Sequence, residues 1–350
     1  MSQSTNPNKA KVEALIAKKK QRQATQSTQD LIDEILKGST KALSETITLL
    51  ESSKVEDQNA AQTIINACIP YSGKAFRIGI TGVPGVGKST FIENFGIELI
   101  NQGKKVAVLA IDPSSEKTGG SIMGDKTRMQ ELSIHPNAYI RPTASSGSLG
   151  GVARKTRESI ILCEACGFDY ILVETVGVGQ SEIAVHSMTD FFLLLMLAGA
   201  GDELQGIKRG IMEMADTILI TKADGDNVKM ANLARLDYKN ALHLFPANEN
   251  NWIPTVETIS SLENHGIDKI IAVLKDYETH TITNGHFDLK RHQQQKYWMH
   301  ETLKDMVLQR TYSNSEFKTL AEKLEKDILD GEISSFNAAE TLYKLLYPND

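Results

Sequence analysis

Several absences narrow the class of protein. The chain has 350 residues but only three cysteines, which makes a disulfide framework unlikely and favours a reducing cytosol. Its longest apolar run, Phe191–Ala200, is too short to cross a bilayer and is typical of a buried central strand. The N-terminus lacks the apolar core of a signal peptide, and Arg22 is its only arginine, unlike a transit peptide. We therefore expect a cytoplasmic protein that does not associate with a membrane.

An excess of positive charge is also missing. The 38 Lys and Arg residues are outnumbered by 44 Asp and Glu residues, for a net charge of −6, which argues against nucleic acid as the main partner. The eight histidines show no metal-binding spacing. Cys163 and Cys166 form C-x-x-C without a second pair, so we interpret them as buried core residues and not as a redox or zinc site.

What the chain does contain is a phosphate-loop motif, in the stretch Phe76–Gly103. A short apolar strand, Phe76–Ile80, leads into GVPGVGKST and then into an amphipathic helix, which fits G-x-x-x-x-G-K-[ST]. The glycines allow backbone N–H groups to surround phosphate oxygens, and the helix start adds further N–H groups. Lys88 is expected at the β- and γ-phosphates and Ser89 on magnesium. The predicted loop comprises Gly82, Val83, Pro84, Gly85, Val86, Gly87, Lys88, Ser89 and Thr90.

Strands alternate with helices from residue 76 to about 275, which predicts an α/β fold with a mostly parallel sheet and helices on both faces. Ligands bind such sheets at the carboxyl ends of the strands. The further strands are expected at 105–111, 138–142, 170–173, 190–197, 217–220 and 253–260.

Acidic residues follow two of these strands. The strand from Tyr170 ends in Glu174, a Walker-B-like signal in which the acid faces magnesium and the N–H of Gly177 reaches the γ-phosphate. A helix cap or an ion-pair partner is the alternative reading of Glu174. Asp112 ends the strand 105–111, and Asp125 lies in the glycine-containing segment after it. We interpret residues 113–128 and 198–210 as mobile switch segments.

The sequence also predicts which base is bound. Thr221-Lys222-Ala223-Asp224 resembles N-K-x-D, in which the Asp carboxylate accepts from N1–H and N2–H₂ of guanine and the Lys stem packs over the ring. Thr221 replaces the usual Asn, so we expect weaker bracing of this loop. Ser260, Ser261 and Leu262 look like a loop whose backbone N–H meets guanine O6. Together these motifs favour GTP and GDP.

The two ends of the chain are predicted to be helical. Residues 1–27 read as a solvated lead-in, 28–72 as an extension of two or three helices, and 73–284 as the nucleotide domain. Residues 285–350 read as a helical tail, which we interpret either as an oligomerisation or partner surface or as a simple cap on the sheet.

Five segments together closely resemble the MeaB/ArgK-type P-loop GTPases, the relatives of the methylmalonic aciduria type A protein. They read GVPGVGKST (82–90), IDPSSEKTGGSIMGDKTRM (111–129), VETVGVGQSE (173–182), AGAGDELQGIKRG (198–210) and TKADGDN (221–227). The resemblance implies a SIMIBI-class fold, a homodimer built with the C-terminal arm, and GTP or GDP with Mg²⁺. It also implies a partner, adenosylcobalamin-dependent methylmalonyl-CoA mutase, for which such proteins act as G-protein chaperones.

The resemblance carries over to individual residues. It implies Ser89, Asp112, Asp125 and Glu174 around the metal, and Lys88, Asp112 and Glu174 in catalysis. Lys208, Arg209 and Arg128 are the alternative candidates for supplying positive charge to the transition state. Because Val178 stands after Gly177, where Ras-like proteins place a water-orienting Gln, we predict slow hydrolysis that the mutase stimulates. Two alternatives stay open: a kinase linked to arginine or ornithine transport, and a metallochaperone GTPase. The sequence identifies neither an acceptor pocket with a base nor the metal ligands that these would need.

Overall fold

The computed structural model describes residues 27–111, 129–143, 149–175, 181–199, 209–246 and 248–347. It divides into two compact units, with the boundary between Asp288 and Leu289. The first unit holds the sheet and the second is helical.

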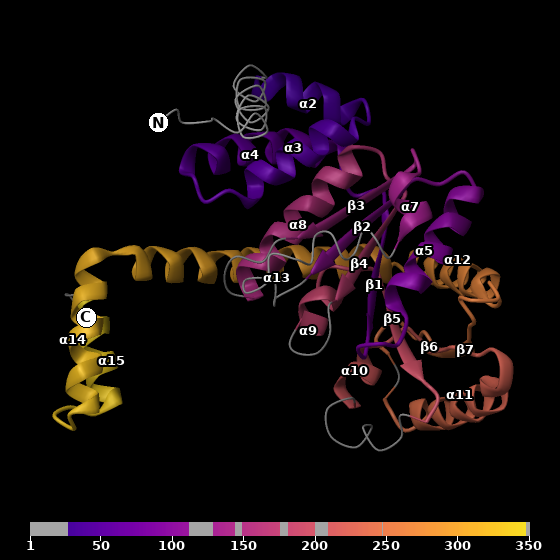
Figure 1. Cartoon of the computed structure of the whole chain (residues 1–350). Helices are drawn as coiled ribbons and strands as arrows, with labels where there is room; N and C mark the ends of the chain where they lie inside the picture. The colour runs from indigo at the N-terminus through magenta and orange to yellow at the C-terminus, as the bar shows by residue number, and fades with distance from the viewer. Residues whose placement is uncertain are drawn as a thin grey trace, which may run out of the picture. The chain divides into compact units, whose positions relative to one another are not determined.

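The first unit is built on a parallel sheet that, in the described residues, has seven strands in the order β3-β2-β4-β1-β5-β6-β7 (Figure 1). Every strand pairs in parallel with its neighbours. The predicted fold class is therefore confirmed. The strands are β1 Phe76–Gly82, β2 Val106–Ile111, β3 Ala138–Thr143, β4 Tyr170–Thr175, β5 Phe191–Leu197, β6 Thr217–Thr221 and β7 Thr255–Thr258.

Helices cover both faces of this sheet (Figure 1). Successive residues of a strand point to opposite faces, and β5 shows the consequence. Leu193 and Leu195 pack in a core with α5 and α12, whereas Leu194 and Met196 pack with α10 and α11. The helices on the two faces are α5 Lys88–Asn101, α7 Gln130–Ile134, α8 Leu149–Ala165, α9 Ser181–His186, α10 Arg209–Met214, α11 Val228–Leu242 and α12 Ile267–Thr283.

The predicted N-terminal extension is helical, with α2 at Thr28–Leu36, α3 at Thr40–Glu51 and α4 at Val55–Cys68. Ser27 starts α2 through a reciprocal capping box with Asp30. The three helices pack on one another and on α8, so the extension forms part of the first unit. Their buried apolar residues include Leu31, Ile35, Leu43, Ile47, Ile64 and Ile65.

Buried charges hold the amino ends of the central strands. The Arg77 guanidinium on β1 makes two hydrogen bonds to Glu164 on α8, at 2.9 and 3.1 Å. The Asp190 carboxylate accepts the Arg77 backbone N–H at 2.8 Å, and the Asp216 carboxylate accepts that of Phe192 at 2.9 Å. These bonds connect β1, β5 and β6 at the end of the sheet opposite the phosphate loop.

The second unit contains most of α13 His286–Ser313, followed by α14 Ser315–Leu329 and α15 Ser335–Leu346, as the sequence predicts for the tail. Asn314 and Ser334 accept backbone N–H groups at the starts of α14 and α15. Large apolar side chains remain exposed on these helices, among them Met299, Leu303 and Phe336. Within the described residues, no helix has the length and apolar character needed to cross a bilayer.

Candidate functional site

The phosphate loop leaves the central strand β1 and enters α5, as predicted. Gly82 has φ +155°, and a Cβ there would lie 2.5 Å from the Leu195 carbonyl oxygen, so the position excludes a side chain. Gly87 has φ +98° and immediately precedes α5. Val86 is fully buried and anchors the loop in the core below it. The loop thus turns back over the carboxyl end of β1 with its backbone tightly constrained.

Lys88, the predicted phosphate-binding residue, is 9% exposed and lies against this loop. Its Nζ donates to the carbonyl oxygen of Gly82 at 2.8 Å and to that of Val83 at 3.4 Å. Burial lowers the pKa of Lys88, and the nearby carboxylates of Glu174 and Glu182 act in the opposite direction. The amine is therefore buried beside two acids.

Glu174 lies at the end of β4, where its residue is only 5% exposed. The sheet register pairs it with Ile80 on β1 and with Ala110 on β2, so the acid stands between the phosphate loop and the strand that leads to Asp112. Sequence analysis did not single out Glu182, which is 3% exposed at the start of α9. The only feature of the sequence that pointed to Glu182 as a site residue was its place at the end of the motif VETVGVGQSE.

The other predicted acids and switch residues lie outside the residues that the structure describes. They are Asp112, Asp125, Gly177 and Lys208, with all of the segment 113–128 and most of 198–210. Within the described ranges, no group of three or more His, Cys, Asp or Glu side chains could hold a metal ion. Ser89 and Glu174 supply oxygen ligands of the kind that Mg²⁺ prefers, so the described part of the site fits that ion.

Thr221, at the start of the predicted base-reading loop, bonds to the phosphate loop. Its hydroxyl donates to the Val86 carbonyl at 2.7 Å and lies 3.3 Å from the Met196 carbonyl. The threonine is 3% exposed, so the bond is shielded from water. The end of β6 thus lies close enough to the phosphate loop for a short side chain to reach it, and whether Thr221 braces the loop less firmly than Asn stays a prediction.

Asp224 and Lys222, the predicted base-reading pair, are held by their neighbours. The Ser260 hydroxyl donates to the Asp224 carboxylate at 2.7 Å, and the Asn227 amide donates to the Lys222 carbonyl at 2.7 Å. Lys222 has φ +55°, a backbone conformation that is uncommon outside glycine. The carboxylate is thus oriented by a hydroxyl from the loop that follows β7.

Ser260, the first residue of the predicted Ser260–Leu262 loop, uses both its backbone and its side chain within the protein. Its N–H donates to the His265 carbonyl at 3.1 Å and is therefore not available to a base oxygen. Its fully buried hydroxyl instead orients Asp224. Among the described residues the Ser261 N–H makes no hydrogen bond, whereas Leu262 turns its side chain to solvent at 83% exposure. The predicted donor to guanine O6 would therefore be the backbone N–H of Ser261 or of Leu262.

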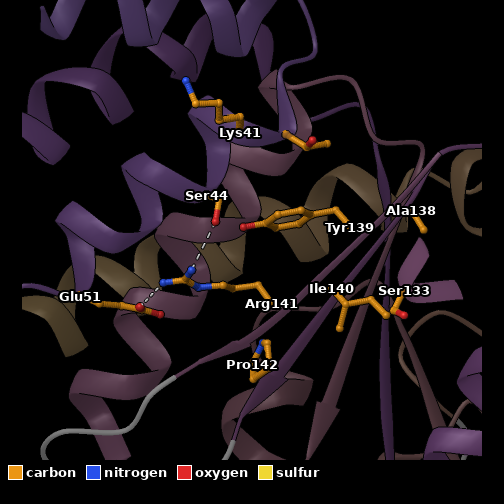
Figure 2. Close-up of a pocket in the computed structure, with 10 residues that line it drawn as sticks. Lys41, Ser44, Glu51, Ser133, Ala138, Tyr139, Ile140, Arg141 and Pro142 are labelled. Carbon is orange, nitrogen blue, oxygen red and sulfur yellow. Dashed lines mark hydrogen bonds and ion pairs between the residues drawn. The ribbon is translucent and has the colours of Figure 1, made fainter. Parts of the chain in front are cut away.

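A separate pocket of about 380 Å³ lies between α3 and β3, the edge strand at the opposite end of the sheet from β7 (Figure 2). Arg141 crosses it and donates to Ser44, Thr48 and Glu51 on α3. Figure 2 shows Tyr139 beside the same helix, and burial raises the pKa of its hydroxyl. None of the predicted site residues lines this pocket, and we assign its polar contacts to docking of the N-terminal helices.

The three cysteines support the structural interpretation of C-x-x-C. Cys68, Cys163 and Cys166 are all buried and free. Burial raises the pKa values of Cys68 and Cys166 to about 11 and that of Cys163 well above its usual range. Buried neutral thiols of this kind belong to the core.

Comparison with known proteins identifies the family. The family model described as methylmalonyl Co-A mutase-associated GTPase MeaB matches residues 43–316. The chain belongs to the MeaB family. Its place there confirms the resemblance found in the sequence. As a MeaB-family GTPase it binds guanine nucleotide and hydrolyses GTP.

Relatives and a solved structure agree with this family assignment. A probable GTPase of Mycobacterium bovis, Mb1533, is 47% identical over 308 residues, covering 88% of this chain and 92% of the relative. The mitochondrial methylmalonic aciduria type A homolog of Mus musculus is 43% identical over 320 residues, covering 89% and 77%. A crystal structure titled LAO/AO transport system kinase is 36% identical, with a TM-score of 0.72 over 91% of this chain and 97% of that one.

Proposed function

We propose that this MeaB-family GTPase is a G-protein chaperone of an adenosylcobalamin-dependent methylmalonyl-CoA mutase. GTP binding and hydrolysis would gate the loading of intact cofactor, its protection and the removal of damaged cofactor. The observation that carries the proposal is the match to the mutase-associated family over residues 43–316. The 43% identical mouse homolog of the methylmalonic aciduria type A protein supports it. The cytoplasmic location expected from the sequence stays a prediction.

The proposed chemistry begins at Lys88. Its amine now donates to the Gly82 and Val83 carbonyls, and on nucleotide binding it would turn to the β- and γ-phosphates. Ser89 and Glu174, with Asp112 and Asp125, would hold Mg²⁺. That ion would neutralise charge on the phosphates when bound.

Partner control of the rate follows from the residue that stands after Gly177. Val178 has no group that could orient the attacking water, so we propose slow intrinsic hydrolysis. The mutase would order the two switch segments, and Lys208 would supply positive charge to the transition state. Ordering of a switch by a partner is a known means of controlling GTPases. The rate of GTP hydrolysis would then depend on whether the mutase is bound.

We also propose that the helical unit from Leu289 onward is a dimerisation arm. Met299, Leu303 and Met306 are each more than half exposed on α13, at the spacing that places them on one side of a helix. A second copy of the chain would cover this apolar stripe. Sedimentation of the wild type and of a Leu303→Glu variant tests the assignment, since a dimer that survives the variant contradicts it.

GTP hydrolysis with and without purified methylmalonyl-CoA mutase is the direct test of the chaperone function. We expect a faster rate with the mutase, and equal rates would contradict the proposal. Asp224→Asn is a matched control, because an amide donates where the carboxylate accepts and should favour xanthine, whose position 2 is a carbonyl. If the mutase acts through the nucleotide site, its stimulation in that variant should require XTP.

A second function is favoured by one observation, the kinase title of the 36% identical solved structure. A kinase would transfer the γ-phosphate to a small acceptor and not to water. GTP labelled at the γ-position distinguishes the two, because label in inorganic phosphate supports the GTPase and label in arginine or ornithine supports the kinase.

A further inference from the structure

One contact joins the phosphate-loop helix to the base loop. Asn94 lies on α5, six residues after Lys88, and its side-chain amide donates to the backbone carbonyl of Ser261. The two residues are 167 positions apart in sequence. Asn94 is half-buried on a helix whose neighbouring turns, at Phe91 and Phe95, lie in the core with α12. The amide therefore projects from a rigid support.

The same loop is held on its other side. Ser260 and His265 exchange backbone hydrogen bonds, at 3.1 and 2.9 Å, and close the turn between them. A trans peptide is planar, with its C=O and N–H pointing in opposite directions. The bond from His265 to the Ser260 carbonyl therefore turns the Ser261 N–H away from His265. Asn94 fixes the next peptide, so both peptides that flank the Ser261 Cα are held.

We propose that Asn94 is a positioning residue for base recognition, which holds Ser261 so that its N–H meets oxygen 6 of guanine. The inference rests on the proposed roles of Asp224 and the Ser260–Leu262 loop. Ser260 links the two readers, because its hydroxyl orients Asp224 while the next residue carries an N–H that makes no hydrogen bond within the described residues. Of the two such N–H groups in this loop, on Ser261 and Leu262, the one on Ser261 lies nearer in sequence to this link. In guanine, the carbon that carries O6 is bonded to N1. A hydrogen-bond donor placed beside the carboxylate of Asp224, which accepts from N1–H, would therefore lie close to O6.

Two GDP analogues separate these contacts. Inosine diphosphate lacks only the 2-amino group and reports on Asp224. The diphosphate of 6-thioguanosine keeps N1–H and the 2-amino group but replaces O6 with sulfur, a weaker acceptor, and reports on the Ser261 N–H. Kd values for GDP and both analogues give two discrimination ratios for each variant.

In Asn94→Leu, which is similar in size but has no donor, the preference for GDP over the 6-thio analogue should fall about threefold to tenfold. The preference for GDP over inosine diphosphate should stay unchanged. Ser260→Ala should give the reverse pattern, since it frees Asp224. The proposal would be overturned if Asn94→Leu left the preference for GDP over the 6-thio analogue unchanged. It would also be overturned if both preferences fell equally. Failure of the wild type to prefer GDP over inosine diphosphate would instead contradict the proposed base-reading site.

Discussion

The Thr221 hydroxyl donates a 2.7 Å hydrogen bond to the carbonyl oxygen of Val86, and this bond joins the base-reading loop to the phosphate loop. Both residues are buried, Thr221 at 3% and Val86 at 0% exposure. The two loops are therefore not independent. We expect a nucleotide that orders one of them to affect the other, in part through this buried contact.

Thr221→Val should weaken this coupling, because valine keeps the shape of threonine and removes the donor. The Val86 carbonyl would lose a buried partner, at a cost of about 1–3 kcal/mol. We expect a lower free energy of unfolding in urea and weaker GDP binding by calorimetry. Thr221→Ser is the matched control, since serine keeps the hydroxyl. Equal GDP affinity in wild type and Thr221→Val would show that the bond does not support the site.

Substitution of the Arg77–Glu164 pair should lower the free energy of unfolding without directly changing the nucleotide site. The side chains are 9% and 0% exposed, so removing one charge leaves the other buried without its opposite charge. Arg77→Met should cost about 3–5 kcal/mol in the free energy of unfolding. The double variant Arg77→Met/Glu164→Leu should lose less than Arg77→Met alone. A double variant that is less stable than Arg77→Met would contradict this interpretation of the pair.

Thiol chemistry gives a pH-dependent prediction. Cys68 and Cys166, with pKa values near 11, should resist iodoacetamide at pH 8 in the folded protein and react in denaturant. Mass spectrometry of the alkylated protein measures both states. The folded pKa values lie above the unfolded value of 9.0, so the unfolded chain loses these protons first. Their contribution to stability is complete below pH 9 and declines as the pH rises toward 11. Rapid labelling of the native protein at pH 8 would contradict the burial.

Much of this site could be predicted because its motifs are local. Gly82, Gly87 and Lys88 stand at a fixed spacing that reflects the shape of one loop, and Glu174 follows an apolar strand that is easily recognised. Alternating strands and helices likewise indicated the parallel sheet. Each of these signals lies within about ten residues of chain.

The contacts that brace the site could not be predicted in the same way. Asn94 meets Ser261 across 167 residues, and Thr221 meets Val86 across 135. Single polar residues in a helix or at a strand end have no periodicity that points to a distant partner. For the same reason the sequence predicted a backbone donor somewhere in the Ser260–Leu262 loop but not the contact of the Ser260 hydroxyl with Asp224. Family motifs can indicate which residues form a site but not which residues hold them in place.

Gly266, which ends the base loop and precedes α12, provides a last test of how rigid that loop must be. It has φ +85°, and a Cβ there would lie 2.7 Å from the Thr258 carbonyl oxygen. Gly285 is the matched control, because it has φ +75° with open space around it. Alanine at either position pays about 1–2 kcal/mol for the left-handed backbone. Only Gly266→Ala must also displace the backbone of β7, so it should lose more stability than Gly285→Ala and should bind GDP more weakly. Parallel urea titrations and GDP calorimetry measure both effects, and equal losses in the two variants would show that the base loop tolerates movement.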